Sequence, residues 1–203
     1  MAVKYARPMS TAEELARDRT SAQALLQEWI ANEALRRHCR AVEIAMRAYA
    51  VELGEDADAW GVVGLLHDFD WERHPTLEQH PTAGEPVLAE RGYPQWFRRA
   101  ILSHANHTGV ARETALEHHL FACDELAGFI HACALMRPDK LVGMEPRSVK
   151  KKLKDKRFAA NVSREDIADG AEAIGRPLDD HIAFVIAALT SHAPELGLSD
   201  AHS

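Results

Sequence analysis

Imidazole and carboxylate side chains interrupt segments of the chain that are otherwise apolar. The apolar run 62–66 ends in His67-Asp68, His38 lies inside a long helix-like segment, and Asp124 flanks a regular apolar stripe. A carboxylate beside a buried stripe costs free energy unless it is paired or binds a metal. Two histidines and two aspartates make an N/O ligand set that suits Fe, Mn, Zn, Co or Ni. The sequence therefore predicts a metal site shared by His38, His67, Asp68 and Asp124.

The adjacent pair His67-Asp68 restricts how that site can be built. Neighbouring residues of an α-helix point about 100° apart, because one turn takes about 3.6 residues. Both side chains reach one centre only at a helix end or at a local distortion. The sequence indicates such an end, because acids and a loop containing Pro75 and Pro81 follow the pair. We therefore expect the apolar run to anchor a helix whose last turn presents two ligands.

Helix patterns predict the elements that must carry these residues, and no segment shows the sustained alternation of a half-buried strand. The first expected helices are a short one opened by the capping box Thr11-x-x-Glu14, one over Glu33–Leu53 between Asn32 and Gly54, and one from Asp56 or Asp58 to His67-Asp68. The next are one opened by Thr82-x-x-Glu85 and stopped near Gly92, and one with Pro94 in its first turn that runs toward His104. The last are a long one opened by Thr114-x-x-Glu117 and ended by Pro138, one from Ser163 to Gly175, and one over about Leu178–Ser191. The predicted fold class is all-α.

Two of these helices carry apolar stripes at helical spacing, which predicts that one face of each is buried. The stripes are Val42, Ala45, Met46, Tyr49 and Leu53 in the first, and Leu116, Leu120, Cys123, Ala127, Ile130 and Ala134 in the second. We expect a single domain over residues 1–203. Its core would be about residues 30–136, and about 137–203 would be a helical extension packed on the same body.

The composition fits a globular protein and limits its partners. Hydrophobic residues make up 46% of the 203 residues, and the net charge is −7, from 24 Lys and Arg against 31 Asp and Glu. An acidic chain argues against general nucleic-acid binding. The start of the chain lacks the apolar segment of a secretory signal, and no apolar stretch approaches the roughly 18 residues that suggest a membrane span.

The cysteines point to the compartment. Cys39, Cys123 and Cys133 are odd in number and form no C-x-x-C pair. A disulfide framework is therefore not expected, and a reducing compartment fits. We expect a cytoplasmic protein, and the sequence leaves a monomer and a homo-oligomer open.

The order His38…His67-Asp68…Asp124 resembles the H…HD…D pattern of the HD superfamily of metal-dependent phosphohydrolases. The resemblance covers roughly residues 30–136, and the segments VVGLLHD and ACDELAGFI are similar to HDIG-type bacterial members. The later segment SVKKKLKDKRFAANVSRE is similar to the C-terminal region of one uncharacterised bacterial group of this type. The resemblance implies an all-helical HD bundle that binds divalent metal.

The segment after the HD pair departs from two patterns within this superfamily. Asp70-Trp71 stands where the HDIG pattern has Ile-Gly. Trp71 also stands where some nucleotidase-like members carry a catalytic Glu, and Glu72 follows one position later. This departure puts a nucleotidase activity in doubt.

HD proteins with two metals place additional histidines between the HD pair and the last aspartate. By this resemblance, His80 and His104 are the candidates for a second ligand set, and Asp68 would bridge the two ions. His107 competes with His104, because it follows three residues later. The implied cofactor is one or two divalent ions among Mn, Fe, Co, Ni, Zn and Mg.

A bound divalent ion would make hydroxide available near pH 7 and would stabilise charge on a phosphate oxygen. The sequence hypothesis is therefore hydrolysis of a small phosphate ester or nucleotide, with Asp68, Asp70 and Glu72 as the catalytic candidates. Two alternatives remain open at this point. One is a di-iron oxygenase of the HD type, and the other is a non-catalytic HD scaffold that binds a nucleotide or a partner.

One dense basic segment stands out in the acidic chain. It contains Lys150, Lys151, Lys152, Lys154, Lys156 and Arg157. On a continuous helix, Lys150, Lys154 and Arg157 would share one face and could steer a phosphorylated substrate toward the metals. A solvated helix surface explains the same pattern.

Overall fold

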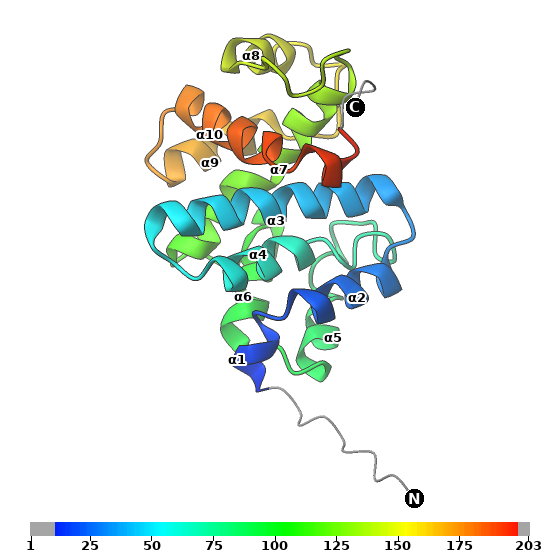
Figure 1. Ribbon diagram of the computed structural model, residues 1–203. Coiled ribbons are helices and arrows are strands. Elements are labelled where there is room, and N and C mark those ends of the chain that lie inside the picture. Colours follow the sequence, from blue (N-terminus) through cyan, green and yellow to red (C-terminus); the bar gives the residue numbers. More distant parts are fainter. Residues whose placement is uncertain (1–10, 199–203) are drawn as a thin grey trace, which may run out of the picture.

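The computed structural model describes residues 11–198, which form ten α-helices and no β-strand (Figure 1). The all-α prediction is confirmed. The helices are α1 Ala12–Leu15, α2 Arg19–Trp29, α3 Glu33–Leu53, α4 Ala57–Leu66, α5 Glu85–Glu90, α6 Gln95–Ser103, α7 Ala115–Leu135, α8 Pro146–Leu153, α9 Arg164–Ala173 and α10 Leu178–Thr190, with the 3₁₀ helices η1 Asn106–Thr108 and η2 Ala193–Leu196. None of the helices in this described part is long and apolar enough to cross a membrane.

Helix α3 crosses the middle of the molecule, and α4 and α7 pack against it (Figure 1). Helices α1, α2, α5 and α6 lie on one side of α3, and α8, α9 and α10 lie on the other. The contact of α4 with α3 is close, because a Cβ at Gly64 would lie 3.1 Å from the backbone of Glu43. These packed helices bring residues far apart in the sequence to one place.

The C-terminal helices share the hydrophobic core of the rest of the chain. The Tyr49 hydroxyl on α3 lies 2.6 Å from His181 Nδ1 on α10, and His181 Nε2 donates to the Ala122 carbonyl of α7 at 2.9 Å. Burial lowers the pKa of His181 to about 4, so this imidazole is neutral at pH 7. We propose on this basis that residues 11–198 form a single domain.

The expected caps and stripes agree with most of the structure. Asn32, Asp56, Thr114 and Ser163 accept hydrogen bonds at the starts of α3, α4, α7 and α9, and Thr11 forms a capping box with Glu14. The stripe of α3 is buried except for Leu53, which is 46% exposed in the last turn. The predicted inner face therefore stops one turn before Gly54.

Several predictions at element boundaries were wrong. Thr82 does not cap a helix, because it lies in a run of turns and α5 begins only after Gly84. Helix α7 ends at Leu135 rather than at Pro138. Helix α2 was missed altogether, although Asp18 caps it with hydrogen bonds from the amides of Thr20 and Ser21.

Glu43 is the buried carboxylate at the centre of an ion-pair cluster with three arginines. Its side chain is 0% exposed and contacts Arg19 Nε at 2.7 Å, Arg40 Nη1 at 2.6 Å and Arg47 Nε at 3.0 Å. A carboxylate buried this deeply is stable only because it is paired. The cluster joins α3 to α2, and Arg47 also reaches the start of α4 through Asp58.

Replacing Glu43 with glutamine should lower the free energy of unfolding by about 2–3 kcal/mol, because three arginines lose their shared carboxylate and one of them stays largely buried. Urea unfolding at pH 7 measures the change. Glu55→Gln, at an exposed site just after α3, is the control and should stay within about 0.5 kcal/mol. Equal losses for both variants would contradict the role of the cluster.

Candidate metal centre

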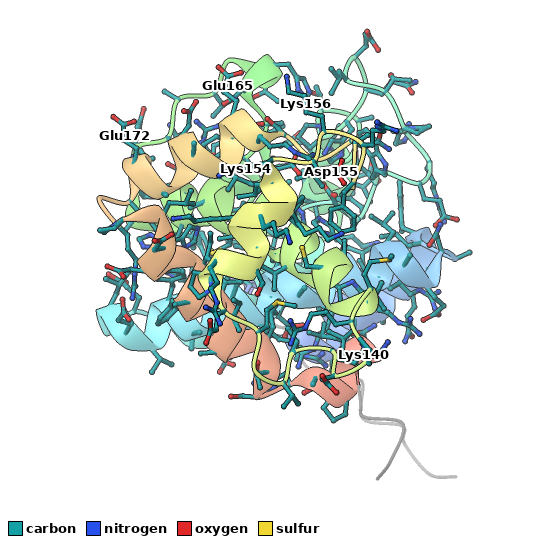
Figure 2. The ribbon with its side chains drawn as sticks, turned by 90° about the horizontal axis from the view of Figure 1, so that it is seen from above. Lys140, Lys154, Asp155, Lys156, Glu165 and Glu172 are labelled. Carbon is teal, nitrogen blue, oxygen red and sulfur yellow. The ribbon has the colours of Figure 1, made fainter. Side chains whose placement is uncertain are left out.

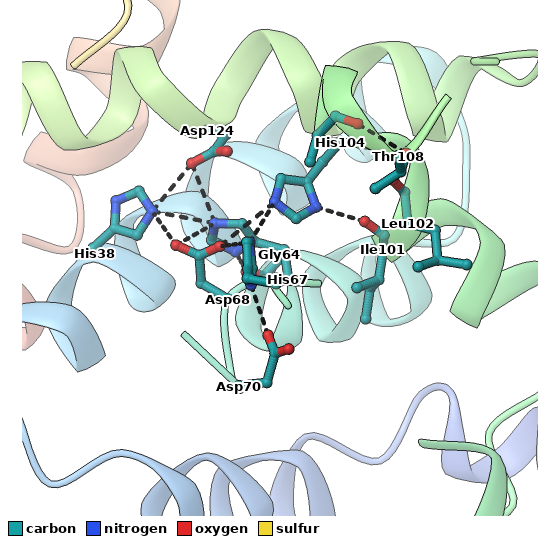
Figure 3. Close-up of polar contacts among 12 residues, drawn as sticks. His38, Gly64, His67, Asp68, Asp70, Ile101, Leu102, His104, Thr108 and Asp124 are labelled. Atoms are coloured by element: carbon teal, nitrogen blue, oxygen red, sulfur yellow. Dashed lines mark hydrogen bonds and ion pairs between the residues drawn. The ribbon is translucent and has the colours of Figure 1, made fainter. Parts of the chain in front are cut away.

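The structure brings the four predicted side chains together (Figure 3). His38 comes from α3, His67 and Asp68 follow the end of α4, and Asp124 lies in the middle of α7. His38 Nε2 lies 3.1 Å from His67 Nε2 and 3.1 Å from Asp124 Oδ1. Asp68 Oδ2 lies 3.5 Å from each of the two histidine Nε2 atoms. The four side chains thus point their donor atoms at one common volume.

A second group contains His80 and His104, the two histidines that the resemblance implied. His80 Nε2 lies 3.3 Å from His104 Nε2 and 3.2 Å from Asp68 Oδ1. His104 Nε2 lies 3.5 Å from the same Asp68 oxygen. Asp68 therefore faces the first group with Oδ2 and the second group with Oδ1.

These separations fit a divalent ion in each group. Two atoms that each lie about 2.1 Å from one ion are about 3.0 Å apart at right angles and about 3.4 Å apart at the tetrahedral angle. The observed separations run from 3.1 to 3.5 Å. The donor set is four imidazoles and two carboxylates, which suits Mn, Fe, Co, Ni or Zn. The residues that are present therefore fit two ions that share Asp68.

Helix ends set the direction of two of the histidines. The last carbonyls of an α-helix have no partner within the helix. His67 Nδ1 donates to the Gly64 carbonyl at 2.8 Å at the end of α4, and His104 Nδ1 donates to the Ile101 carbonyl at 2.5 Å at the end of α6. Because Nδ1 carries the proton of this hydrogen bond, Nε2 is the ring atom left to bind a metal, and in both histidines it points into the site. This explains why the apolar run before His67 ends in an imidazole.

Asp70 orients His80 in the same manner. His80 Nδ1 donates to Asp70 Oδ1 at 2.7 Å, and the Asp70 side chain is fully buried. A Cβ at Gly84 would lie 2.8 Å from the Asp70 carboxyl, so only glycine fits there without displacing it. Carboxylates behind a ligating histidine fix its ring and raise its basicity. The structure places Asp70 behind His80 rather than in the cavity.

The histidines and carboxylates shift one another's pKa values. Burial lowers the pKa of His38, but Asp124 and Asp68 outweigh it and raise that pKa to about 10. Burial also lowers the pKa of His80, and Asp68 and Asp70 raise it to about 9. Burial raises the pKa of Asp68, but the surrounding histidines hold it well below its usual range. Ions bound here would take the place of protons on the imidazoles.

Both groups open into one cavity of about 480 Å³. His38, Asp68, His80, His104 and Asp124 line it, together with Trp71, which stands in place of the catalytic Glu of some nucleotidase-like members. The lining also includes residues that the sequence did not predict to be near the metal groups, namely Asn106, Phe121, Glu125, Asn161 and Asp166. Burial, and then the charge of Asp124, raises the pKa of Glu125 to about 7.

Their sequence signals are weak. Glu125 simply follows Asp124 on a helix. Asp166 is an acid in the first turn of α9, where acids are common because they interact favourably with the helix dipole. Asn161 and Asp166 also lie in the segment expected to be an extension. Only the packing of α9 against α7 brings that segment to the metal groups.

Glu72 lies elsewhere. Its carboxylate accepts hydrogen bonds from the backbone amides of Ala31 and Asn32, at 3.0 and 2.8 Å, just before α3. Glu72 is exposed and does not line the cavity. The turn that follows α4 directs it toward the α2–α3 connection.

The basic segment also differs from its expected form. Helix α8 ends at Leu153 and Lys154 is its cap, so Lys150, Lys154 and Arg157 do not share one face of a continuous helix. Figure 2 shows Lys154 and Lys156 near the end of this helix. Lys150 pairs with Asp179 of α10 at 2.7 Å, and none of these basic residues lines the cavity.

Comparison with protein-family models matches residues 35–128 to the HD domain. Searches among curated proteins and among solved structures found no match. The matched range contains both histidine–aspartate groups but stops before Asn161 and Asp166. The match does not extend to the HDIG subtype. The helical architecture, the H…HD…D order and this match together identify residues 35–128 as an HD domain.

Proposed function

We propose that the protein is a metal-dependent phosphohydrolase that acts on a small phosphate ester. In this proposal His38, His67 and Asp124 would hold one ion, His80 and His104 would hold a second, and Asp68 would lie between the two. The observation that carries this proposal is the position of Asp68, whose two oxygens each face one group. When bound, the ions would supply a hydroxide near pH 7 and would stabilise charge on the phosphoryl oxygens.

The charge of the cavity supports two ions rather than one. Asp68, Asp124, Glu125 and Asp166 line it, whereas no Lys or Arg of residues 11–198 does. Even with Glu125 protonated, the other three carboxylates outweigh a single divalent cation and leave a negative cavity, which would repel a phosphate ester. Two divalent cations offset the carboxylates. In this proposal the buried Nδ1 contacts of His67 and His104 keep the ligands in place before substrate arrives.

The decisive experiment measures metal content and reaction together. Purified protein is analysed for bound metal and is then loaded separately with Mn, Fe, Co, Ni, Zn or Mg. Phosphate release is followed from para-nitrophenyl phosphate, bis-para-nitrophenyl phosphate and a set of nucleotides. We expect two ions per chain and metal-dependent release from at least one ester. Oxygen consumption by the iron-loaded protein, without phosphate release from any ester, would contradict the proposed hydrolase and would support an oxygenase.

We further propose a cytoplasmic location and a small phosphorylated molecule as the partner. All three cysteines are free and buried, which fits a reducing compartment.

Reversing the charge of Lys150, Lys154 and Arg157 to glutamate tests the remaining substrate-binding candidates. Because none of them lines the cavity, we expect the KM for the ester identified above to change less than about twofold at 0.15 M salt, where exposed charges are screened beyond about 8 Å. A rise in KM above about tenfold would show that these basic residues steer the substrate toward the metal groups.

A further inference from the structure

One part of the cavity wall belongs to neither metal group. Asn106 of η1, Glu125 of α7, and Asn161 and Asp166 from the region of α9 form it. Asn161 and Asp166 lie beyond residue 128, where the HD match ends. The HD core and the segment that follows it therefore build this wall together.

Hydrogen bonds hold this wall in place. Asn106 Nδ2 donates to Asp166 Oδ1 at 3.0 Å, and Arg112 donates to Asn106 Oδ1. The guanidinium of Arg112 lies 3.5 Å from the centre of the Phe121 ring and does not itself line the cavity. The guanidinium of Arg112 thus orients the Asn106 amide, and Asp166 lines the cavity.

The loop that carries Asn161 is also fixed. Arg164 donates to the carbonyls of Asp155, Phe158, Ala159 and Val162. Its guanidinium also lies over the ring of Phe129 on α7. In the segment DKRFAANVSRE, the single side chain of Arg164 therefore binds four backbone carbonyls of the residues that precede it.

The chemistry of the wall limits what can lie against it. Its carboxylate and amide oxygens accept hydrogen bonds from hydroxyl or amino groups. Two ions would offset the carboxylates of the cavity, and one phosphoryl group then adds negative charge. A second anionic group on the substrate would meet Asp166 and Glu125, and none of the described residues that line the cavity is a Lys or Arg that could offset it.

We propose, on the basis of the proposed function, that the substrate is a phosphomonoester whose organic end is uncharged or cationic and carries hydrogen-bond donors. Asp166, together with Glu125, selects against substrates with a second anionic group. The segment after the HD match therefore supplies specificity.

The test compares two three-carbon monophosphates that differ at the far end. sn-Glycerol 3-phosphate ends in a hydroxyl, whereas 3-phosphoglycerate ends in a carboxylate. For the metal-loaded protein we expect kcat/KM to favour the hydroxyl compound by at least about tenfold. Asp166→Asn should reduce this ratio at least about threefold. Glu165→Gln, at the exposed neighbour of Asp166 in the same helical turn, is the matched control and should leave it unchanged.

Each result decides between clear alternatives. A wild-type ratio near one, or a ratio that Asp166→Asn and Glu125→Gln both leave unchanged, would overturn the inference even if para-nitrophenyl phosphate is hydrolysed. A merely structural role of Asp166 would lower both kcat/KM values by the same factor. If no ester is hydrolysed, the proposed function fails, and calorimetric binding of the same two compounds to the manganese-loaded variants then tests the inference through the ratio of their Kd values.

Discussion

Asp68→Ala should reduce metal-dependent phosphate release by at least about 10³-fold, because Asp68 belongs to both of the metal groups found among the described residues. Metal-ion catalysis supplies several kcal/mol of transition-state stabilisation, and about 4 kcal/mol corresponds to about 10³ in rate. The bound metal should also fall from two ions per chain to fewer than one. Removal of any other ligand leaves one of the two groups complete.

The measurement combines kcat/KM with metal analysis of the same preparation. Asp58→Ala is a control on α4, because Asp58 is exposed and its carboxylate pairs with Arg47, which belongs to neither metal group. It should keep both ions and full activity. Asp68→Ala protein that is folded by circular dichroism, retains two ions and hydrolyses the ester at the normal rate would rule out the bridging role and the mechanism built on it.

The sequence predicted the elements around the site better than it predicted the cavity. The end of α4 at His67 followed from the apolar run, the acids after it and the prolines, because these features end helices for local reasons. The position of His80 and His104 beside Asp68 could not follow from spacing. It depends on a run of turns over residues 75–84 and on the packing of α6, which no local pattern encodes.

Glu72 is a residue that the sequence placed at the metal groups and the structure places elsewhere. Its distance along the chain from His67 and Asp68 suggested a role at the metal, but the turn after α4 sends it to the amides before α3. Asp166 lies almost one hundred residues from Asp68 and nevertheless lines the same cavity. Local sequence patterns therefore predicted the candidate ligands, whereas tertiary packing decided which other polar groups face them.

Metal removal should make the stability of the protein strongly dependent on pH. In metal-free protein the pKa of His38 is raised to about 10 and that of His80 to about 9, against an unfolded value of about 6.5. A raised folded pKa stabilises the protein fully below the unfolded value, and this stabilisation is lost as the pH rises through the folded value. The metal-free protein should therefore lose stability from about pH 6.5 to about pH 10.

The metal-loaded protein should respond in a different manner. Bound ions need deprotonated imidazoles, so metal binding strengthens over the same pH range. A loss of about 3 kcal/mol from the metal-free form corresponds to about 6–12 °C in Tm for a chain of this size. The gap between the Tm values of loaded and EDTA-treated protein should widen by about that amount between pH 6.5 and pH 9.5. Below pH 6.5 both forms should lose stability, because the lowered pKa of His181 requires a neutral imidazole.

Thermal unfolding of the two forms, in steps of half a pH unit, measures this gap. His38→Gln should flatten the pH dependence of the EDTA-treated protein, because it removes the imidazole whose pKa is raised to about 10. His192→Gln is the matched control, since His192 and Glu195 form an exposed pair at 2.8 Å in which each side chain is 45% exposed. Screening by water makes such a pair contribute little, so this variant should keep the wild-type slope. Parallel Tm curves for loaded and EDTA-treated wild-type protein would show that the buried histidines and carboxylates do not bind the ions.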